Sequence, residues 1–227
     1  MRTVRFQSEP GEIPVGKILC LGRNYAAHAK EMQAEIPSEP VVFLKPSTAL
    51  VSEGGTVVIP PFSKELHHEV EMVVVIGREG SRIPRERALE YVAGYAVGLD
   101  MTLRDLQVIA KSKGLPWSVA KGFDTSAPVS AAVRRDKVAD PHSLKLSLKV
   151  NGVVRQQSST AAMIFPIDAV VSYLSSVFTL EPGDLIFTGT PEGIGPVKPG
   201  DLLEAELESV GTLRVHVQSA EGRDRHG

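Results

Sequence analysis

The chain has 227 residues, a formal net charge of −2 and a single cysteine, Cys20, so no intramolecular disulfide can form. The near-neutral charge gives no electrostatic basis for nucleic-acid binding, and no apolar run reaches the roughly 20 residues that span a bilayer. Because the polar N-terminus also lacks a signal-like apolar stretch, we expect a cytoplasmic protein without nucleic-acid or membrane partners.

The first half of the chain alternates short apolar segments with turns rich in proline and glycine. These patterns predict strands over 15–21, 41–44, 56–59, 67–76 and 94–99. They predict helices over 24–32, over 85–92 after Pro84, and over 102–113. We expect one main domain over 15–218, preceded by a short segment over 1–14 and followed by a polar tail over 219–227.

The second half is richer in predicted strands. Asn151-Gly152 suits a type I′ turn, so residues 144–157 are expected to form a β-hairpin. A helix opened by Pro166 follows over 167–177, and further strands are predicted over 184–188, 202–207 and 213–217, the last two paired. Because strands and helices do not alternate regularly, the fold class expected is α+β, predominantly β, with a mixed and mostly antiparallel sheet.

The strand predicted over 67–76 carries two carboxylates just before an unbroken apolar run. Glu69 and Glu71 are two residues apart, so both side chains point to one face, roughly 7 Å apart along the backbone. The pair is either a solvated strand end or half of an ion site, because a divalent cation would remove the repulsion between them. Oxygen ligands favour Mg²⁺, Mn²⁺ or Ca²⁺ over zinc.

Asp100 is the candidate third ligand, because it stands where a short apolar strand ends. It could instead be the N-cap of the following helix, unless Thr102 and Asp105 form that cap.

Arg104 and Gln107 share a face of the same helix. An arginine beside a metal site suits a substrate carboxylate, although a surface ion pair with Asp100 or Glu71 is the alternative. Asp105 and Lys111 are expected to be solvated.

A second cluster lies in GRNYAAHAKEM, where His28 and Glu31 are three residues apart. On a helix the carboxylate could orient the imidazole as a general base for water, although most such pairs are merely exposed neighbours. Lys121 stands among small and apolar residues, which indicates a buried cation or one that reaches to solvent. The glycine-rich turn TGTPEGIG could present backbone N–H groups to an anion, but it lacks the lysine of a P-loop.

From about Lys17 to Val217 the chain resembles the fumarylacetoacetate hydrolase superfamily, and its length is similar to that of the single-domain members that act on acylpyruvates or oxaloacetate. The matching stretches, in chain order, are GRNYAAHAKEM, FLKP, LHHEVEMVVVIG, GYAVGLDMTLRDLQ, AKGFDTSAPVS, LKVNGVVRQ and PGDLIFTGTPEGIG.

The resemblance implies a rolled mixed β-sheet with a few short helices, and a homodimer. It implies that Glu69, Glu71 and Asp100 hold Mg²⁺ or Mn²⁺, and that His28 and Glu31 activate water from a lid. It also implies roles around the 2-oxo acid substrate: the residues expected to bind it are Arg23, Arg104, Gln107, Lys121 and Thr190, and Lys121 is expected to act in catalysis as well. His67 and His68 are expected to be supporting residues and not ligands.

The implied reaction is metal-dependent cleavage of a C–C bond in a 2-oxo acid through a metal-stabilised enolate. Hydrolysis of acylpyruvates or fumarylpyruvate and decarboxylation of oxaloacetate share that intermediate. An isomerase of 2-hydroxyhepta-2,4-diene-1,7-dioate type is the alternative activity. A β-rich module with a structural metal is the non-catalytic alternative, and a cupin-type site is disfavoured because cupin sites are usually rich in histidine.

Overall fold

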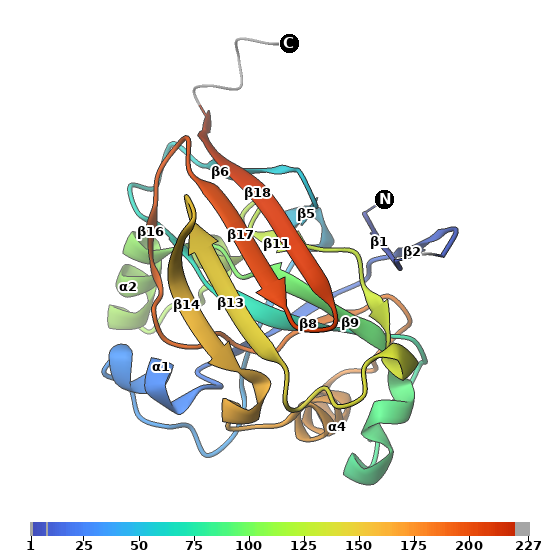
Figure 1. The fold of residues 1–227 in the computed structure, drawn as a ribbon. Helices are drawn as coiled ribbons and strands as arrows, with labels where there is room; N and C mark the ends of the chain where they lie inside the picture. Colours follow the sequence, from blue (N-terminus) through green and yellow to red (C-terminus); the bar gives the residue numbers. More distant parts are fainter. Residues whose placement is uncertain (1, 8, 221–227) are drawn as a thin grey trace.

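The computed structural model describes residues 2–7 and 9–220 and consists mainly of strands arranged in two large, curved layers (Figure 1). The largest sheet has the strand order β4-β3-β15-β8-β9-β11-β5, and β12 pairs with β9 beside this path. Its strands are β3 (Ile18–Gly22), β4 (Val41–Lys45), β5 (Leu50–Ser52), β8 (Val70–Ile76), β9 (Val92–Leu99), β11 (Ala127–Val129), β12 (Val133–Arg134) and β15 (Leu185–Phe187).

A five-stranded sheet forms the second layer, in the order β14-β13-β17-β18-β6. Its strands are β6 (Thr56–Ile59), β13 (Lys145–Val150), β14 (Val153–Ser159), β17 (Leu202–Leu207) and β18 (Gly211–Ser219). Figure 1 shows this sheet lying across β8 and β9. A three-stranded sheet joins β7 (Leu66–His68), β10 (Thr102–Leu103) and β16 (Gly195–Val197), and β1 (Thr3–Arg5) pairs with β2 (Glu12–Pro14).

The helices are short and lie at the edges of the sheets. They are α1 (Ala26–Glu31), α2 (Arg104–Ser112), α3 (Ser118–Lys121) and α4 (Ile167–Val177), with 3₁₀ turns at Ser47–Ala49, Arg85–Tyr91, Arg135–Lys137 and Thr160–Ala162. In Figure 1, α1 and α2 lie on the same side of the molecule. No helix within the described residues is long and apolar enough to cross a membrane.

Strand β8 is buried on both faces, which explains its unbroken apolar sequence. Met72, Val74 and Ile76 belong to the larger core, which lies between the two sheets. Val73 and Val75 belong to a smaller core on the other face. Because side chains alternate along a strand, Glu71 continues the face of Val73 and Val75 and ends the smaller core with a carboxylate.

The hairpin predicted around Asn151-Gly152 is confirmed, with antiparallel pairing of β13 and β14 and a positive φ at both turn residues, 52° and 79°. Such φ values are what a type I′ turn requires. The predicted pairing of the last two strands is also confirmed, as β17 and β18. The sheets contain both parallel and antiparallel pairs, with antiparallel pairs in the majority, as expected for the α+β class.

Three predicted elements are corrected by long-range pairing. The single strand predicted over 67–76 is two strands, β7 and β8, which belong to different sheets and are separated by Glu69. The helix predicted over 85–92 is a 3₁₀ helix that ends at Tyr91, whose carbonyl accepts from the Gly77 N–H. The helix predicted from Thr102 begins at Arg104, because Thr102 and Leu103 pair with β7.

In the predicted N-terminal segment, β1 and β2 form a small hairpin, and Phe6 packs into the smaller core. Of the predicted polar tail, Ser219 ends β18, whereas residues 221–227 lie outside the described residues.

Candidate active site

Three buried carboxylates converge where β8 begins and β9 ends. Glu69, Glu71 and Asp100 each offer an oxygen, and these atoms lie within 4.8 Å of one another. The register explains the convergence: β8 and β9 are antiparallel, and the Asp100 N–H donates to the Glu69 carbonyl at 2.8 Å. Asp100 therefore stands opposite Glu69, and Glu71 is two residues further along the same face.

Two lysines sit among these carboxylates. The Lys121 ammonium donates to Glu69 Oε2 at 2.7 Å, to Asp100 Oδ2 at 2.6 Å and to the Thr102 hydroxyl at 2.7 Å. Burial alone would lower the pKa of Lys121, but the carboxylates of Asp100 and Glu69 outweigh it and raise that pKa above its ordinary value. Lys45, from β4, is also buried and pairs with the other oxygen of Asp100 at 2.8 Å.

Glu71 lacks the cation that the other two carboxylates have. Only 1% of this residue is exposed, its Oε2 accepts from the Gly189 N–H at 2.7 Å, and among the described residues it forms no ion pair. Burial and the charges of Asp100 and Glu69 raise its pKa well above the ordinary value. A buried carboxylate without a cation, beside two others, is costly, and an oxygen-only donor set suits a hard divalent ion. The residues present therefore fit a divalent metal.

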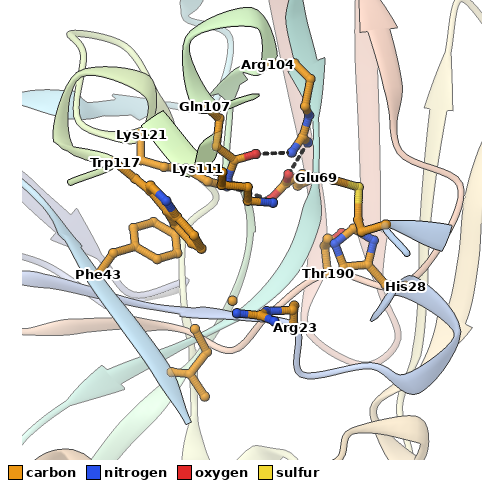
Figure 2. Close-up of a pocket in the computed structure, with 13 residues that line it drawn as sticks. Arg23, His28, Phe43, Glu69, Arg104, Gln107, Lys111, Trp117, Lys121 and Thr190 are labelled. Atoms are coloured by element: carbon orange, nitrogen blue, oxygen red, sulfur yellow. Dashed lines mark hydrogen bonds and ion pairs between the residues drawn. The ribbon is translucent and has the colours of Figure 1, made fainter. Parts of the chain in front are cut away.

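Helix α2 contributes two buried polar side chains on one face. The Arg104 guanidinium donates to Glu69 Oε1 and to the side-chain oxygen of Gln107 (Figure 2). Burial alone would raise the pKa of Glu69, but Lys121 and Arg104 hold it well below its ordinary value. The alternative of a surface ion pair with Asp100 or Glu71 is wrong, because Arg104 is buried and its partner is Glu69.

The His28–Glu31 pair forms on α1 as the spacing predicted. His28 Nδ1 lies 3.1 Å from Glu31 Oε2, and the other Glu31 oxygen accepts from the Gly193 N–H at 3.0 Å. A carboxylate at Nδ1 favours the tautomer with its proton there, which leaves the lone pair on Nε2. Since His28 is buried and lines the pocket, this nitrogen is available as a base.

The turn TGTPEGIG, residues 188–195, presents its N–H groups to carboxylates of the chain itself, at Glu71 and Glu31. Gly189 has a φ of 96°, and a Cβ there would lie 2.6 Å from that of Asn24, so glycine is required. Thr190 accepts from the Gln156 amide at 2.8 Å, and the Gln156 oxygen accepts from the Val70 N–H at 3.0 Å. Gln156, from β14, therefore fixes both the turn and the chain beside Glu69.

These groups surround one pocket with an empty volume of about 370 Å³. Figure 2 shows side chains that are far apart in the sequence, from Arg23 to Thr190, around it. The pocket is lined by Leu21, Gly22, Arg23, His28, Met32, Phe43, Glu69, Arg104, Gln107, Lys111, Trp117, Lys121 and Thr190. The residues predicted to bind substrate are thus all at its wall, whereas Glu71, Asp100 and Glu31 lie beside it.

Some sequence expectations need correction. Asp100 is not an N-cap, and neither Thr102 nor Asp105 caps α2: the N-cap is Leu103, without a side-chain hydrogen bond. Asp105 is not simply solvated, because it accepts from the Ser63 hydroxyl and the Lys64 N–H. Lys121 does not reach to solvent, since only 2% of it is exposed.

Three contributing residues were missed. Lys111 is exposed, as expected, but it also lines the pocket, and its position seven residues after Arg104 was a signal, since both lie on one helix face. Lys45 and Gln156 carry no comparable local signal, because their partners lie far away in sequence. Of the two histidines, His68 contacts the Gln156 oxygen at 2.9 Å and His67 contacts Glu65 at 2.8 Å.

Comparison with known proteins gives close matches over nearly the whole chain. Residues 17–218 match the family described as fumarylacetoacetate (FAA) hydrolase C-terminal. The chain is 53% identical over 204 residues to oxaloacetate tautomerase FAHD1, mitochondrial, of Mus musculus, with 90% of this chain and 92% of the relative covered.

Solved structures agree. Fumarylpyruvate hydrolase from Pseudomonas aeruginosa, in complex with Mn²⁺ and pyruvate, superposes with a TM-score of 0.92 at 41% identity, covering 96% of this chain and 95% of that one. The 5-carboxymethyl-2-hydroxymuconate delta-isomerase from Mycobacterium smegmatis superposes with a TM-score of 0.82 at 40% identity, covering 92% of this chain and 80% of that one. The fold expected from the sequence is thus confirmed, and the chain belongs to the fumarylacetoacetate hydrolase family.

Proposed function

We propose that this enzyme cleaves C–C bonds in 2-oxo acids with the help of a divalent ion held by Glu69, Glu71 and Asp100. The observation that carries the proposal is the buried carboxylate triad beside a pocket that also holds a base and several cations. The relatives support it, since one is named a fumarylpyruvate hydrolase and another an oxaloacetate tautomerase. The substrates proposed are acylpyruvates, fumarylpyruvate and oxaloacetate.

The proposed ion is Mg²⁺ or Mn²⁺, because all three ligands are carboxylate oxygens. When bound, it would act as a Lewis acid toward the keto-acid end of the substrate and stabilise the negative charge that develops on the keto oxygen. The presence of Mn²⁺ and pyruvate in the Pseudomonas aeruginosa structure supports this assignment.

The side chains around the pocket orient the keto-acid end of the substrate. Arg104 and Gln107 offer planar donors from one helix face, and Thr190 and Arg23 face them from the turn and from the end of β3. Lys121 keeps a positive charge at this end of the pocket, because its ammonium is held between two of the proposed ligands, and this charge stabilises negative charge that develops on the substrate.

For hydrolysis, His28 acts as the base that removes a proton from water. The resulting hydroxide adds to the acyl carbonyl, and the bond between that carbon and the neighbouring CH₂ breaks. The electron pair of this bond passes to the pyruvate enolate, which takes up a proton, so the products are pyruvate and a carboxylic acid. Glu31 holds the imidazole and stabilises its positive charge.

For decarboxylation of oxaloacetate, the bond between the CH₂ carbon and the distal carboxylate breaks. Carbon dioxide leaves, the electron pair forms the same enolate, and protonation gives pyruvate. This reaction needs no water nucleophile, so it depends less on His28 than hydrolysis does.

A second candidate is keto–enol isomerisation, in which a proton moves between carbon and oxygen without C–C cleavage. Two relatives support this candidate, because one is named an oxaloacetate tautomerase and the other a delta-isomerase. The same His28 base could carry that proton.

Purified protein with Mg²⁺ should be assayed on acetylpyruvate, fumarylpyruvate and oxaloacetate, with enol loss followed separately from CO₂ release. We predict that His28→Ala lowers hydrolysis by about 10²–10⁴-fold, the typical contribution of a general base, and spares part of the decarboxylation. An equal loss of both activities would contradict this division of roles. Turnover of none of the three by the native enzyme would refute the proposed function and leave the non-catalytic alternative.

Three further proposals concern the whole protein. We propose one catalytic domain over residues 15–218 and a cytoplasmic location, which cell fractionation would test.

We also propose a homodimer, because the exposed Leu44 and Leu115 lie in an apolar groove between β4 and the start of α3. A monomeric mass in light scattering would contradict the dimer.

A further inference from the structure

Lys111 lies on the same face of α2 as Arg104 and Gln107, but it does not share their contacts. Its side chain points into the pocket (Figure 2), and its ammonium lies 5.3 Å from the centre of the Trp117 ring. Among the described residues Lys111 forms no ion pair. A stacked ammonium at a pocket wall, with no carboxylate of its own, is free to bind an anion.

The surroundings of Lys111 are strongly cationic. Burial lowers its pKa, and Arg104, Lys121 and Arg23 act in the same direction against the single carboxylate of Glu69. Because Lys111 is exposed, solvent screens part of this effect. Holding like charges together here is costly unless an anion joins them.

Arg23 is a second cation at this wall without a partner in the described chain. Its Nε is buried and makes no hydrogen bond there, and its backbone has a φ of 61°. This left-handed conformation is unusual for a residue other than glycine, and such conformations cluster at binding sites.

The charges of the site indicate how much negative charge the pocket can take. Glu69 and Asp100 form ion pairs with Lys45, Arg104 and Lys121. With Glu71, which has no cation of its own, the three carboxylates equal these three cations in number. A divalent ion adds two positive charges, of which the carboxylate at the keto end of a substrate cancels one. Lys111 and Arg23 add two more, so a ligand with a single carboxylate leaves the pocket strongly positive.

We infer that Lys111 binds the second, distal carboxylate of a dicarboxylic 2-oxo acid, with Arg23 beside it, and so makes the enzyme selective for dicarboxylic over monocarboxylic substrates. The inference rests on the proposed function for the keto-acid end of the site and adds the residue that recognises the other end. Lys111 is in this account a substrate-binding residue and takes no part in the proton transfers of His28.

The test compares two unreactive 2-oxo acids that differ in the distal carboxylate, pyruvate and 2-oxoglutarate. Their affinities for the Mn²⁺-loaded protein are measured by calorimetry in the native protein and in Lys111→Met, Lys111→Arg and Lys113→Met. The last variant is the matched control, because Lys113 is an exposed lysine just after α2 and does not line the pocket.

We expect Lys111→Met to weaken 2-oxoglutarate binding about tenfold, the loss of one charge-assisted hydrogen bond at a partly exposed site. Pyruvate binding should change less than about twofold, and Lys111→Arg should keep most of the preference because it retains the charge. An equal loss for both ligands, or an unchanged affinity for 2-oxoglutarate, would overturn the inference. Because these ligands are not turned over, the result stands apart from the activity assay, whose failure would refute the proposed function alone.

Discussion

Lys45 shows how much of the site depends on a side chain that never faces the pocket. Its ammonium pairs with Asp100 at 2.8 Å and donates to the backbone carbonyls of Met101, at 3.3 Å, and of Lys121. One cation therefore holds a proposed metal ligand and the end of the helix that carries Lys121. Since Lys45 is 2% exposed, these contacts are made away from water.

We predict that Lys45→Met lowers the free energy of unfolding by about 3 kcal/mol, because removing one partner leaves a buried carboxylate only partly compensated. Urea unfolding of the metal-free protein measures this change. The control is Lys149→Met, an exposed lysine on β13, which should change stability by less than about 0.5 kcal/mol. A loss for Lys45→Met no larger than that of the control would show that Asp100 does not need this cation.

Among the secondary-structure elements, the start of α2 determines where two pocket residues lie, because Arg104 and Gln107 both belong to the first turns of this helix. No side chain caps this helix in the usual way. Instead Asp105, in its first turn, accepts from the Ser63 hydroxyl at 2.7 Å and from the Lys64 N–H at 2.9 Å. The helix is thus anchored to the loop that precedes β7.

This anchor predicts a pH-dependent contribution to stability. Burial alone would raise the pKa of Asp105, but the Lys64, Ser63 and Leu106 donors outweigh it and hold the pKa below its ordinary value of 3.8. The stabilisation is therefore complete above the pKa of the unfolded chain and is lost as the pH falls through the lower, folded-state pKa.

Asp105→Asn should accordingly lower the free energy of unfolding by about 1 kcal/mol at pH 7. The difference from the native protein should begin to shrink as the pH drops below 3.8, the ordinary pKa of Asp, and should be lost below the lower, folded-state pKa of Asp105. Urea unfolding at several pH values measures the difference. A gap that stays constant down to pH 2 would contradict the role of the Asp105 charge.

For the molecule as a whole, metal binding and folding should be coupled, because the proposed ligands come from three places: β8, the residue after β9, and the residue between β7 and β8. A ligand that binds only the folded state stabilises it by about 2.7 kcal/mol at a hundred times its Kd. At about 2–4 °C per kcal/mol for a chain of this size, Mn²⁺ should raise Tm by roughly 5–10 °C.

Glu71→Gln should remove that response. The neutral amide keeps the shape of the side chain, so the metal-free variant should be at least as stable as the native protein, which contains a buried carboxylate with a raised pKa. Melting curves with and without Mn²⁺ test this, with Glu204→Gln on β17 as the control. An equal rise in Tm in Glu71→Gln and in the native protein would exclude Glu71 as a ligand.

The sequence predicts those parts of the molecule that local rules determine. Asn151-Gly152 favours a type I′ turn between two strands. Along residues 70–76 successive side chains point to opposite faces of the strand, which places Glu71 on a defined face. The break at Glu69 could not be predicted, because it arises where β7 and β8 pair with different strands. The same holds for His68 and Gln156, which meet across 88 residues. The resemblance to a known family supplied the residues that periodicity alone could not select.

The central claim is that Glu69, Glu71 and Asp100 hold one divalent ion where β8 begins and β9 ends. Crystals grown with Mn²⁺ and measured at a wavelength where manganese scatters anomalously locate the ion directly. The account predicts one strong peak per chain, surrounded by oxygens of these three carboxylates. A peak elsewhere, or none between them at saturating Mn²⁺, would contradict it.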